Sequence, residues 1–143
     1  MHNFSILQNG APVETIDGSL PFEVKVNFEV LRDLNLFRTG VYFKTPMGDT
    51  VLRSFIGDWH PEREDIKAGT YEAMLSVPGK FLMGGNYLVN FHASRYGIVN
   101  YFGETQIQQL INVSTPTEFN SAHLSESVDY SVIMQSDWQV SGV

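Results

Sequence analysis

The sequence predicts an all-β fold: an immunoglobulin-like or jelly-roll antiparallel sandwich of about eight strands. Three observations lead to this prediction. Apolar and polar residues alternate in several segments, turn residues separate those segments, and helical periodicity is almost absent. The chain has 143 residues, the usual size of one domain, so residues 1–143 are expected to form a single sandwich.

The clearest strand is expected at residues 22–30. Its apolar positions are Phe22, Val24, Val26, Phe28 and Val30, and its polar positions are Glu23, Lys25, Asn27 and Glu29. Successive side chains of a strand point to opposite faces, so this pattern indicates a half-buried strand. A helix would scatter the same apolar residues around its circumference.

The other strands are expected on the same grounds. In chain order they are Phe4–Gln8, the segment around Val41–Lys44, Thr50–Ile56, Tyr71–Val77, Tyr87–Ser94, Leu110–Val113 and Val128–Met134. Residues 46–49 form a turn that makes the second and third of these a hairpin. Single helical turns are expected at Glu62–Lys67 and Lys80–Met83. The longest irregular stretches are Gly57–Ala68, Tyr96–Gln108 and Pro116–Glu126.

Composition limits the classes of partner. Charged residues are 17% of the chain and aromatic residues 13%, against roughly 25% charged in typical globular domains. The formal net charge is −7 and Lys and Arg form no run, so nucleic acid and anionic membranes are not expected partners. A surface of neutral hydrogen-bonding groups suits a neutral polar ligand. The absence of cysteine excludes disulfides and thiolate metal sites.

No catalytic or cofactor-binding motif is recognisable. The chain lacks a phosphate-binding glycine loop, a dinucleotide fingerprint and a nucleophile elbow, and its four histidines have no metal-ligand spacing. The acidic cluster between Asp58 and Asp65 is either a metal loop or, as we favour, a solvated loop. No cofactor, no metal and no catalytic residue are therefore expected, and the domain itself is not expected to be an enzyme.

Outward-facing residues of two strands form the candidate site. Sandwich connectivity places the strands around residues 42 and 90 side by side. This brings together Tyr42, Lys44, Asn90, His92 and Ser94. A ring that stacks on a sugar and planar polar groups that bind hydroxyls make such a face suitable for carbohydrate. An ordinary solvated sheet face explains the same residues equally well.

Two further residues, Arg95 and Trp59, complete the candidates. Arg95, like Lys44 or Arg53, could supply a local positive charge for an anionic cap. Trp59 lies in a polar loop, where it is either a ligand platform or packed over the sandwich edge. Trp138 is expected in the core, packed from the last strand.

Three segments resemble a known family. They are the strands and hairpin formed by Phe22–Val30, Gly40–Phe43 and Met47–Val51; the run Ile66–Pro78 followed by Phe81–Val89; and the strand Gln109–Val113. The chain is similar there to the Wzt C-terminal domain, which is attached to the ATP-binding subunit of bacterial O-antigen polysaccharide ABC transporters. The likeness covers most of the chain, and its motifs are structural rather than catalytic.

The resemblance implies a binding function. It implies an immunoglobulin-like sandwich that binds the non-reducing, often capped, end of a finished polysaccharide. It also implies that the chain is a C-terminal fragment of a longer ATPase subunit, cytoplasmic and associated with the inner membrane through the transporter's membrane subunit. A homodimer formed by exchange of the C-terminal strand, residues 127–140, is a further implication. Ligand residues vary within such domains, so none is transferred from the family.

Two other functions remain open on the sequence. One is a protein-interaction or adhesion sandwich that uses an exposed strand edge. The other is a glycosidase accessory or catalytic domain, for which paired carboxylates alone are no evidence because the chain has 16 acidic residues.

Overall fold

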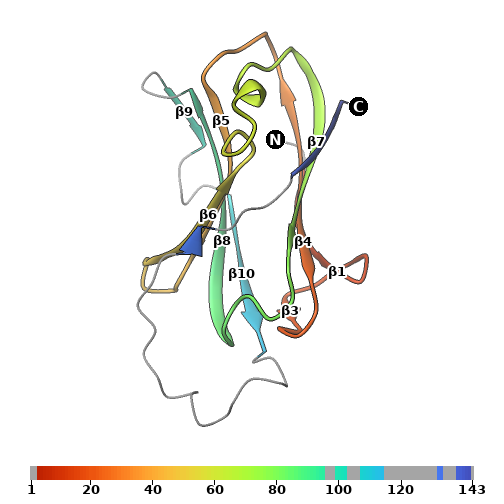
Figure 1. The fold of residues 1–143 in the computed structure, drawn as a ribbon, viewed down its shortest axis with the longest axis vertical. Helices are drawn as coiled ribbons and strands as arrows, with labels where there is room; N and C mark the ends of the chain where they lie inside the picture. Colours follow the sequence, from red (N-terminus) through yellow and green to blue (C-terminus); the bar gives the residue numbers. More distant parts are fainter. Residues whose placement is uncertain (1–2, 96–98, 103–106, 115–131, 134–137, 143) are drawn as a thin grey trace.

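The computed structural model of the chain is a two-layered β-sandwich (Figure 1). The structure describes residues 3–95, 99–102, 107–114, 132–133 and 138–142. The all-β prediction is confirmed: apart from one 3-10 turn, η1 (Pro61–Glu64), the regular elements are strands. Within the described residues no helix is long and apolar enough to cross a membrane.

One layer is an antiparallel sheet of five strands in the order β12-β7-β4-β1-β2. Its strands are β1 (Asn3–Gln8), β2 (Ala11–Pro12), β4 (Phe22–Val30), β7 (Gly69–Val77) and β12 (Gln139–Gly142). The alternation of β4 predicts its faces correctly, because its apolar positions are buried and its polar positions are not. The long β4–β7 pairing, with Phe22 opposite Val77 and Val30 opposite Gly69, is the centre of this layer.

The other layer has seven strands in the order β11-β6-β5-β8-β10-β3, with β9 also paired to β8. Its strands are β3 (Thr15–Ile16), β5 (Phe37–Lys44), β6 (Thr50–Phe55), β8 (Gly85–Arg95), β9 (Val99–Phe102), β10 (Gln108–Val113) and β11 (Val132–Ile133). Two short pairings, β10–β3 and β11–β6, are parallel. The predicted hairpin is confirmed as β5 and β6 joined through residues 45–49.

Aromatic rings fill the space between the layers. Phe28 of β4 packs on Phe37 and Phe91 of the opposite sheet, with ring centroids 6.2 and 6.4 Å apart. Phe22 meets Phe43 in the same way at 6.1 Å. These contacts join strands of opposite sheets, so burial of apolar side chains holds the two sheets together.

Several details differ from the sequence prediction. The short strands β2 and β3 were not expected, and β9 lies within a stretch expected to be irregular. The helical turn expected at Lys80–Met83 is wrong: Lys80 has a φ of 61°, which a right-handed helix cannot continue. The turn expected at Glu62–Lys67 forms instead at Pro61–Glu64. Of the strand expected at Val128–Met134 only β11 is described, and Pro116–Glu126 lies outside the described residues.

Trp138 joins the edges of the two sheets. Its side chain is 2% exposed, and its indole Nε1–H donates a hydrogen bond of 2.9 Å to Ser54 Oγ in β6. Arg63 Nη1 donates to the Trp138 carbonyl at 3.0 Å. Directly after Trp138 the chain pairs with β7 of the opposite sheet as β12. The expected core position of Trp138 is therefore confirmed, with a polar anchor that the sequence did not indicate.

We predict that Trp138→Ala lowers the free energy of unfolding by about 3–5 kcal/mol, because it leaves a cavity between the sheets. Urea denaturation at one fixed protein concentration measures this. Trp59→Ala is the matched control; Trp59 is 51% exposed, so its loss should cost about 0.5 kcal/mol or less. Equal losses for the two variants would contradict the assigned role of Trp138.

Candidate functional site

The outer face of the seven-stranded sheet carries the predicted site residues. Strand β5 pairs with β8, and Tyr42 lies opposite Asn90. In the same register Gly40 faces His92 and Lys44 faces Leu88. Directly opposed residues share a face of the sheet. The structure therefore brings Tyr42, Lys44, Asn90, His92 and Ser94 to one face, as the sequence predicts.

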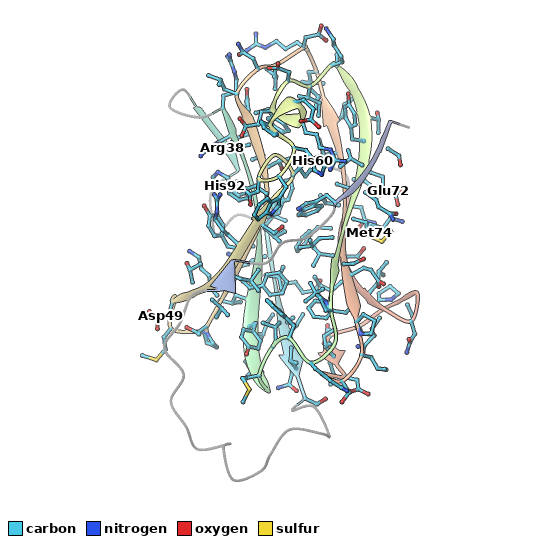
Figure 2. The ribbon with its side chains drawn as sticks, viewed as in Figure 1. Arg38, Asp49, His60, Glu72, Met74 and His92 are labelled. Atoms are coloured by element: carbon cyan, nitrogen blue, oxygen red, sulfur yellow. The ribbon has the colours of Figure 1, made fainter. Side chains whose placement is uncertain are left out.

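Three rings pack together at the centre of this face, and we call Tyr42, Phe55 and His92 the aromatic cluster. The Phe55 and His92 rings are stacked, with centroids 5.6 Å apart and an interplanar angle of 3°. Tyr42 meets both edge-on, at 5.4 Å from Phe55 and 5.9 Å from His92. Figure 2 shows His92 on this sheet, in the layer that also carries Arg38. Because Phe55 is buried and Tyr42 is partly exposed, Tyr42 is the ring within reach of a ligand.

Gly40 makes the stack possible. It lies on β5, which runs between β6 and β8. In the register of the sheet it is opposite Phe55 of β6 and His92 of β8. A Cβ atom at Gly40 would lie 2.6 Å from both Cα and Cδ1 of Phe55. Only glycine leaves enough space for the Phe55 ring of β6 and the His92 ring of β8 to meet above β5.

A β-bulge decides which side chains of β6 share the face. Lys44 lies opposite Thr50, but the register shifts by one residue between Phe43 and Lys44, and Tyr42 then lies opposite Arg53. A shift of one residue moves every later side chain to the other face. As a result Arg53 and Phe55 join Tyr42 on the outer face.

The sequence prediction did not include Phe55 in the site. Residues 50–56 are apolar at both odd and even positions, so the pattern does not say which set faces outward. The signal that could have found Phe55 is Gly40, since an isolated glycine within a strand often marks a close approach by neighbouring groups.

Asn90 and Ser94 lie on the outer face but are not open to solvent. They are 2% and 5% exposed. Asn90 Nδ2 donates to Gln108 Oε1 of β10 at 3.0 Å, and Ser94 Oγ lies 3.1 Å from His92 Nε2. Ser94 is therefore better placed to orient His92, and Asn90 to join β8 to β10, than either is to contact a ligand.

Two cations flank the aromatic cluster. The Arg53 guanidinium lies over the Phe55 ring, 4.5 Å from its centroid. Asp58 accepts a 2.7 Å hydrogen bond from Arg53 Nη2 and a 2.9 Å hydrogen bond from the Phe55 N–H. On the other side of Tyr42, Lys44 Nζ lies 5.5 Å from the ring centroid. The cluster thus has a cationic side chain at each end, and the one beside Phe55 is paired with Asp58.

Arg95 does not belong to this face. It is the last residue of β8 and belongs to the odd-numbered positions of that strand, whereas His92 and Ser94 belong to the even-numbered positions. Its guanidinium forms hydrogen bonds with Asn35. Its Nε donates to the Asn35 carbonyl at 3.2 Å and its Nη2 to Asn35 Oδ1. Arg95 is therefore not brought together with the other predicted site residues, and its role in binding stays a prediction. Trp59 lies in the loop after β6, next to Asp58, and is about half exposed.

The acidic segment between Asp58 and Asp65 forms ion pairs. Asp58 pairs with Arg53, and Glu64 lies 3.5 Å from Arg38. Within the described part of the chain, no group of three or more His, Asp or Glu side chains is arranged to hold a metal ion. The ion pairs of Asp58 and Glu64 agree with a solvated loop.

A separate cavity of about 620 Å³ opens between the sheets at the end where β4 leads into β5. Its aromatic lining consists of Phe28, Phe37, Phe91 and Tyr101, and Glu29 and Arg32 also contribute. It lies between the layers, whereas the aromatic cluster lies on the outside of one layer. The sequence prediction did not indicate this cavity.

Comparison with known proteins supports the fold. No protein-family model matches the chain, and no curated protein matches it significantly. Among solved structures, the chain is similar to the crystal structure of the C-terminal domain of Wzt, with a TM-score of 0.59 and 15% sequence identity. The similarity covers 90% of this chain and 81% of that one. The chain therefore has a Wzt C-terminal domain-like fold, as its sequence resemblance implies.

We predict that Gly40→Ala destabilises the fold by about 1–3 kcal/mol, because the added methyl overpacks the β5–β6 contact. It should also separate the Phe55 and His92 rings, which NMR shifts of the His92 imidazole would report. Gly142→Ala is the control, since a Cβ there meets nothing within 4 Å. Unchanged stability and unchanged His92 shifts in Gly40→Ala would refute the packing role.

Proposed function

We propose that this domain is a non-catalytic carbohydrate-binding module that recognises the capped non-reducing end of an O-antigen polysaccharide for export by an ABC transporter. The observation that carries the proposal is the aromatic cluster on the outer face of the seven-stranded sheet. The Wzt-like fold supports the transport context.

The geometry suits a sugar. Tyr42 offers a partly exposed ring, held edge-on by Phe55 and His92 so that it loses little freedom on binding. The C–H face of a pyranose packs on such a ring, and the Arg53 and Lys44 donors beside it can bind hydroxyl or charged groups. Polar groups around one apolar platform are the usual arrangement of a small-molecule site.

The proposal includes the partners implied by the resemblance. The domain would act as a part of a longer cytoplasmic ATPase subunit, held at the inner membrane by the transporter's membrane subunit. It would form a homodimer in which β12 and Trp138 come from the partner copy. The short β12 and the anchor between Trp138 and Ser54 are compatible with contacts made between copies as well as within one.

An adhesion role is less well supported. Strand addition needs an edge that presents a long row of unpaired backbone groups. In the described residues the sheets end in β2, β12, β3 and β11, which have two to four residues each. The outer face offers a more developed binding surface than these edges.

We predict that Tyr42→Ala weakens binding of a capped O-antigen polysaccharide at least about tenfold, which corresponds to 1.4 kcal/mol. Isothermal titration calorimetry with capped and uncapped polysaccharides measures this. Asn27→Ala, on the outer face of the other sheet, is the control and should leave affinity unchanged. Negligible binding of every polysaccharide by the unaltered domain would overturn the proposed function.

The strand exchange can be tested with an engineered disulfide. The chain has no cysteine, and Ser141 of β12 lies opposite Glu72 of β7. We predict that a Glu72→Cys/Ser141→Cys double variant, oxidised and run on a non-reducing gel, migrates as a covalent dimer. A cross-linked monomer would show that β12 pairs within its own chain. Each single-cysteine variant is the matched control.

Deletion of residues 127–143 gives a second measurement of the same exchange. We predict that the truncated chain aggregates or fails to fold, because it loses Trp138 from between the sheets and β12 from the edge of β7. Light scattering and circular dichroism would show this. A soluble, well-folded monomer after truncation would contradict strand exchange.

A further inference from the structure

The cavity between the sheets has an apolar inner wall. Its volume of about 620 Å³ lies within the range of roughly 300–1,000 Å³ that is usual for small-molecule sites. Buried side chains of three strands form this wall: Phe28 and Val30 of β4, Phe37 of β5, and Phe91 and Ala93 of β8. Because these side chains carry no hydrogen-bonding group, a sugar placed among them would lose the partners of its hydroxyl groups. The cavity therefore suits an apolar group.

The mouth of the cavity exposes apolar surface to solvent. Leu31 lines the cavity and is nevertheless 85% exposed, and Tyr101 of β9 lines it and is 37% exposed. Leu36, in the same connection between β4 and β5, is also exposed. Apolar surface that continues from a cavity to the exterior is a feature of ligand-binding grooves. The charged residues of the lining, Glu29 and Arg32, have opposite signs, so they do not favour a head group of one charge.

Hydrogen bonds keep the cavity open. The connection between β4 and β5, residues 31–36, crosses from one sheet to the other at the upper end of the sandwich in Figure 1. On one side Leu34 exchanges two backbone hydrogen bonds with Ile66, of 2.8 and 2.9 Å. On the other side the Arg95 guanidinium of β8 donates to Asn35. Because both sides of the connection are anchored, the space between the sheets is formed before a ligand arrives.

The same connection contains a strained residue. Leu36 has a φ of 55°, in the left-handed region that bulky side chains rarely adopt. It lies between Asn35, which Arg95 holds, and Phe37, whose ring lines the cavity. Strained conformations persist where the surrounding structure fixes them, and they are frequent at ligand-binding positions.

The arrangement of the rings favours a flexible chain over a flat ligand. Phe28 is tilted by 41° to Phe37 and by 38° to Phe91, and Phe37 is tilted by 52° to Tyr101. A flat aromatic ligand would need two parallel walls, whereas an alkyl chain can bend to follow tilted ones. Contact with such a chain would also restore dispersion interactions that the lining residues lack while the cavity is empty.

We propose that this cavity binds the alkyl chain of an uncharged amphiphile, with the chain between the sheets and the polar head group at the mouth beside Tyr101. The site is separate from the aromatic cluster, which lies on the outside of the seven-stranded sheet. The inference therefore goes beyond the proposed carbohydrate-binding function and does not depend on it.

A series of alkyl maltosides, from hexyl to dodecyl, tests the inference by isothermal titration calorimetry, with each compound kept below its critical micelle concentration. We expect affinity to rise about fourfold for each added methylene and to level off once the chain fills the cavity. Maltose has the same head group and no chain, so it is the control and should show none of this affinity. Failure of every maltoside to bind, or a rise without a plateau, would overturn the assignment.

Matched variants locate the chain. Ala93 lines the cavity and is buried, so Ala93→Leu should move the plateau to shorter chains and weaken binding of decyl maltoside at least about tenfold. Ala11→Leu makes the same change at an exposed position of β2, at the other end of the five-stranded sheet, and should alter neither quantity. Leu31→Ser removes apolar surface from the mouth and should weaken binding about threefold to tenfold. Because Leu31 is exposed, this variant decides the outcome if Ala93→Leu fails to fold.

The remaining outcomes identify a different occupant. Binding and a plateau that are unchanged in both Ala93→Leu and Leu31→Ser would place the chain elsewhere and refute the assignment. If the maltosides do not bind and Leu31→Ser instead lowers self-association in analytical ultracentrifugation, a second copy of the chain covers the cavity and the inference fails. Neither result would affect the carbohydrate-binding function, which is tested separately with polysaccharides and Tyr42→Ala.

Discussion

The register between β5 and β6 is the constraint on which both the core and the candidate site depend. A single bulge between Phe43 and Lys44 shifts that register by one residue. Beyond the bulge, Leu52 and Ser54 point into the sandwich, while Arg53 and Phe55 point out of it. Without the shift these pairs would exchange faces, which would bury the Arg53 guanidinium and expose the Leu52 side chain. Burial of an unpaired charge is costly enough to fix the observed register.

The same register connects the interior with the surface. Ser54 accepts the indole hydrogen bond of Trp138 on the inside, and its neighbour Phe55 stacks on His92 on the outside. Gly40 of β5 lies between β6 and β8 and leaves room for the stacked rings. Because the site residues belong to long paired strands rather than to free loops, the aromatic cluster is rigid before a ligand arrives. Rigidity of this kind reduces the entropy lost on binding.

The features of this surface favour recognition rather than catalysis. In the described residues, the carboxylates near the aromatic cluster, Asp58 and Glu64, are paired with arginines. Glycoside hydrolysis needs two carboxyl groups facing one bond, one of them available as an acid. An aromatic ring flanked by cations instead offers a platform and charge complementarity.

The sequence by itself determined the fold class and most long strands, because period-two alternation specifies which side chains share a face. Together with sandwich connectivity it also placed Tyr42 and Lys44 on the same face as Asn90 and His92. It also placed Trp138 in the core. Only the tertiary structure decided that Phe55 and Arg53 complete the site, that Asn90 and Ser94 are covered, and that Arg95 bonds Asn35 instead. Alternation is ambiguous wherever both faces of a strand are apolar, as in β6, and a bulge changes the face without leaving a mark in the pattern. Local sequence therefore fixes the strands, whereas packing between them fixes the site.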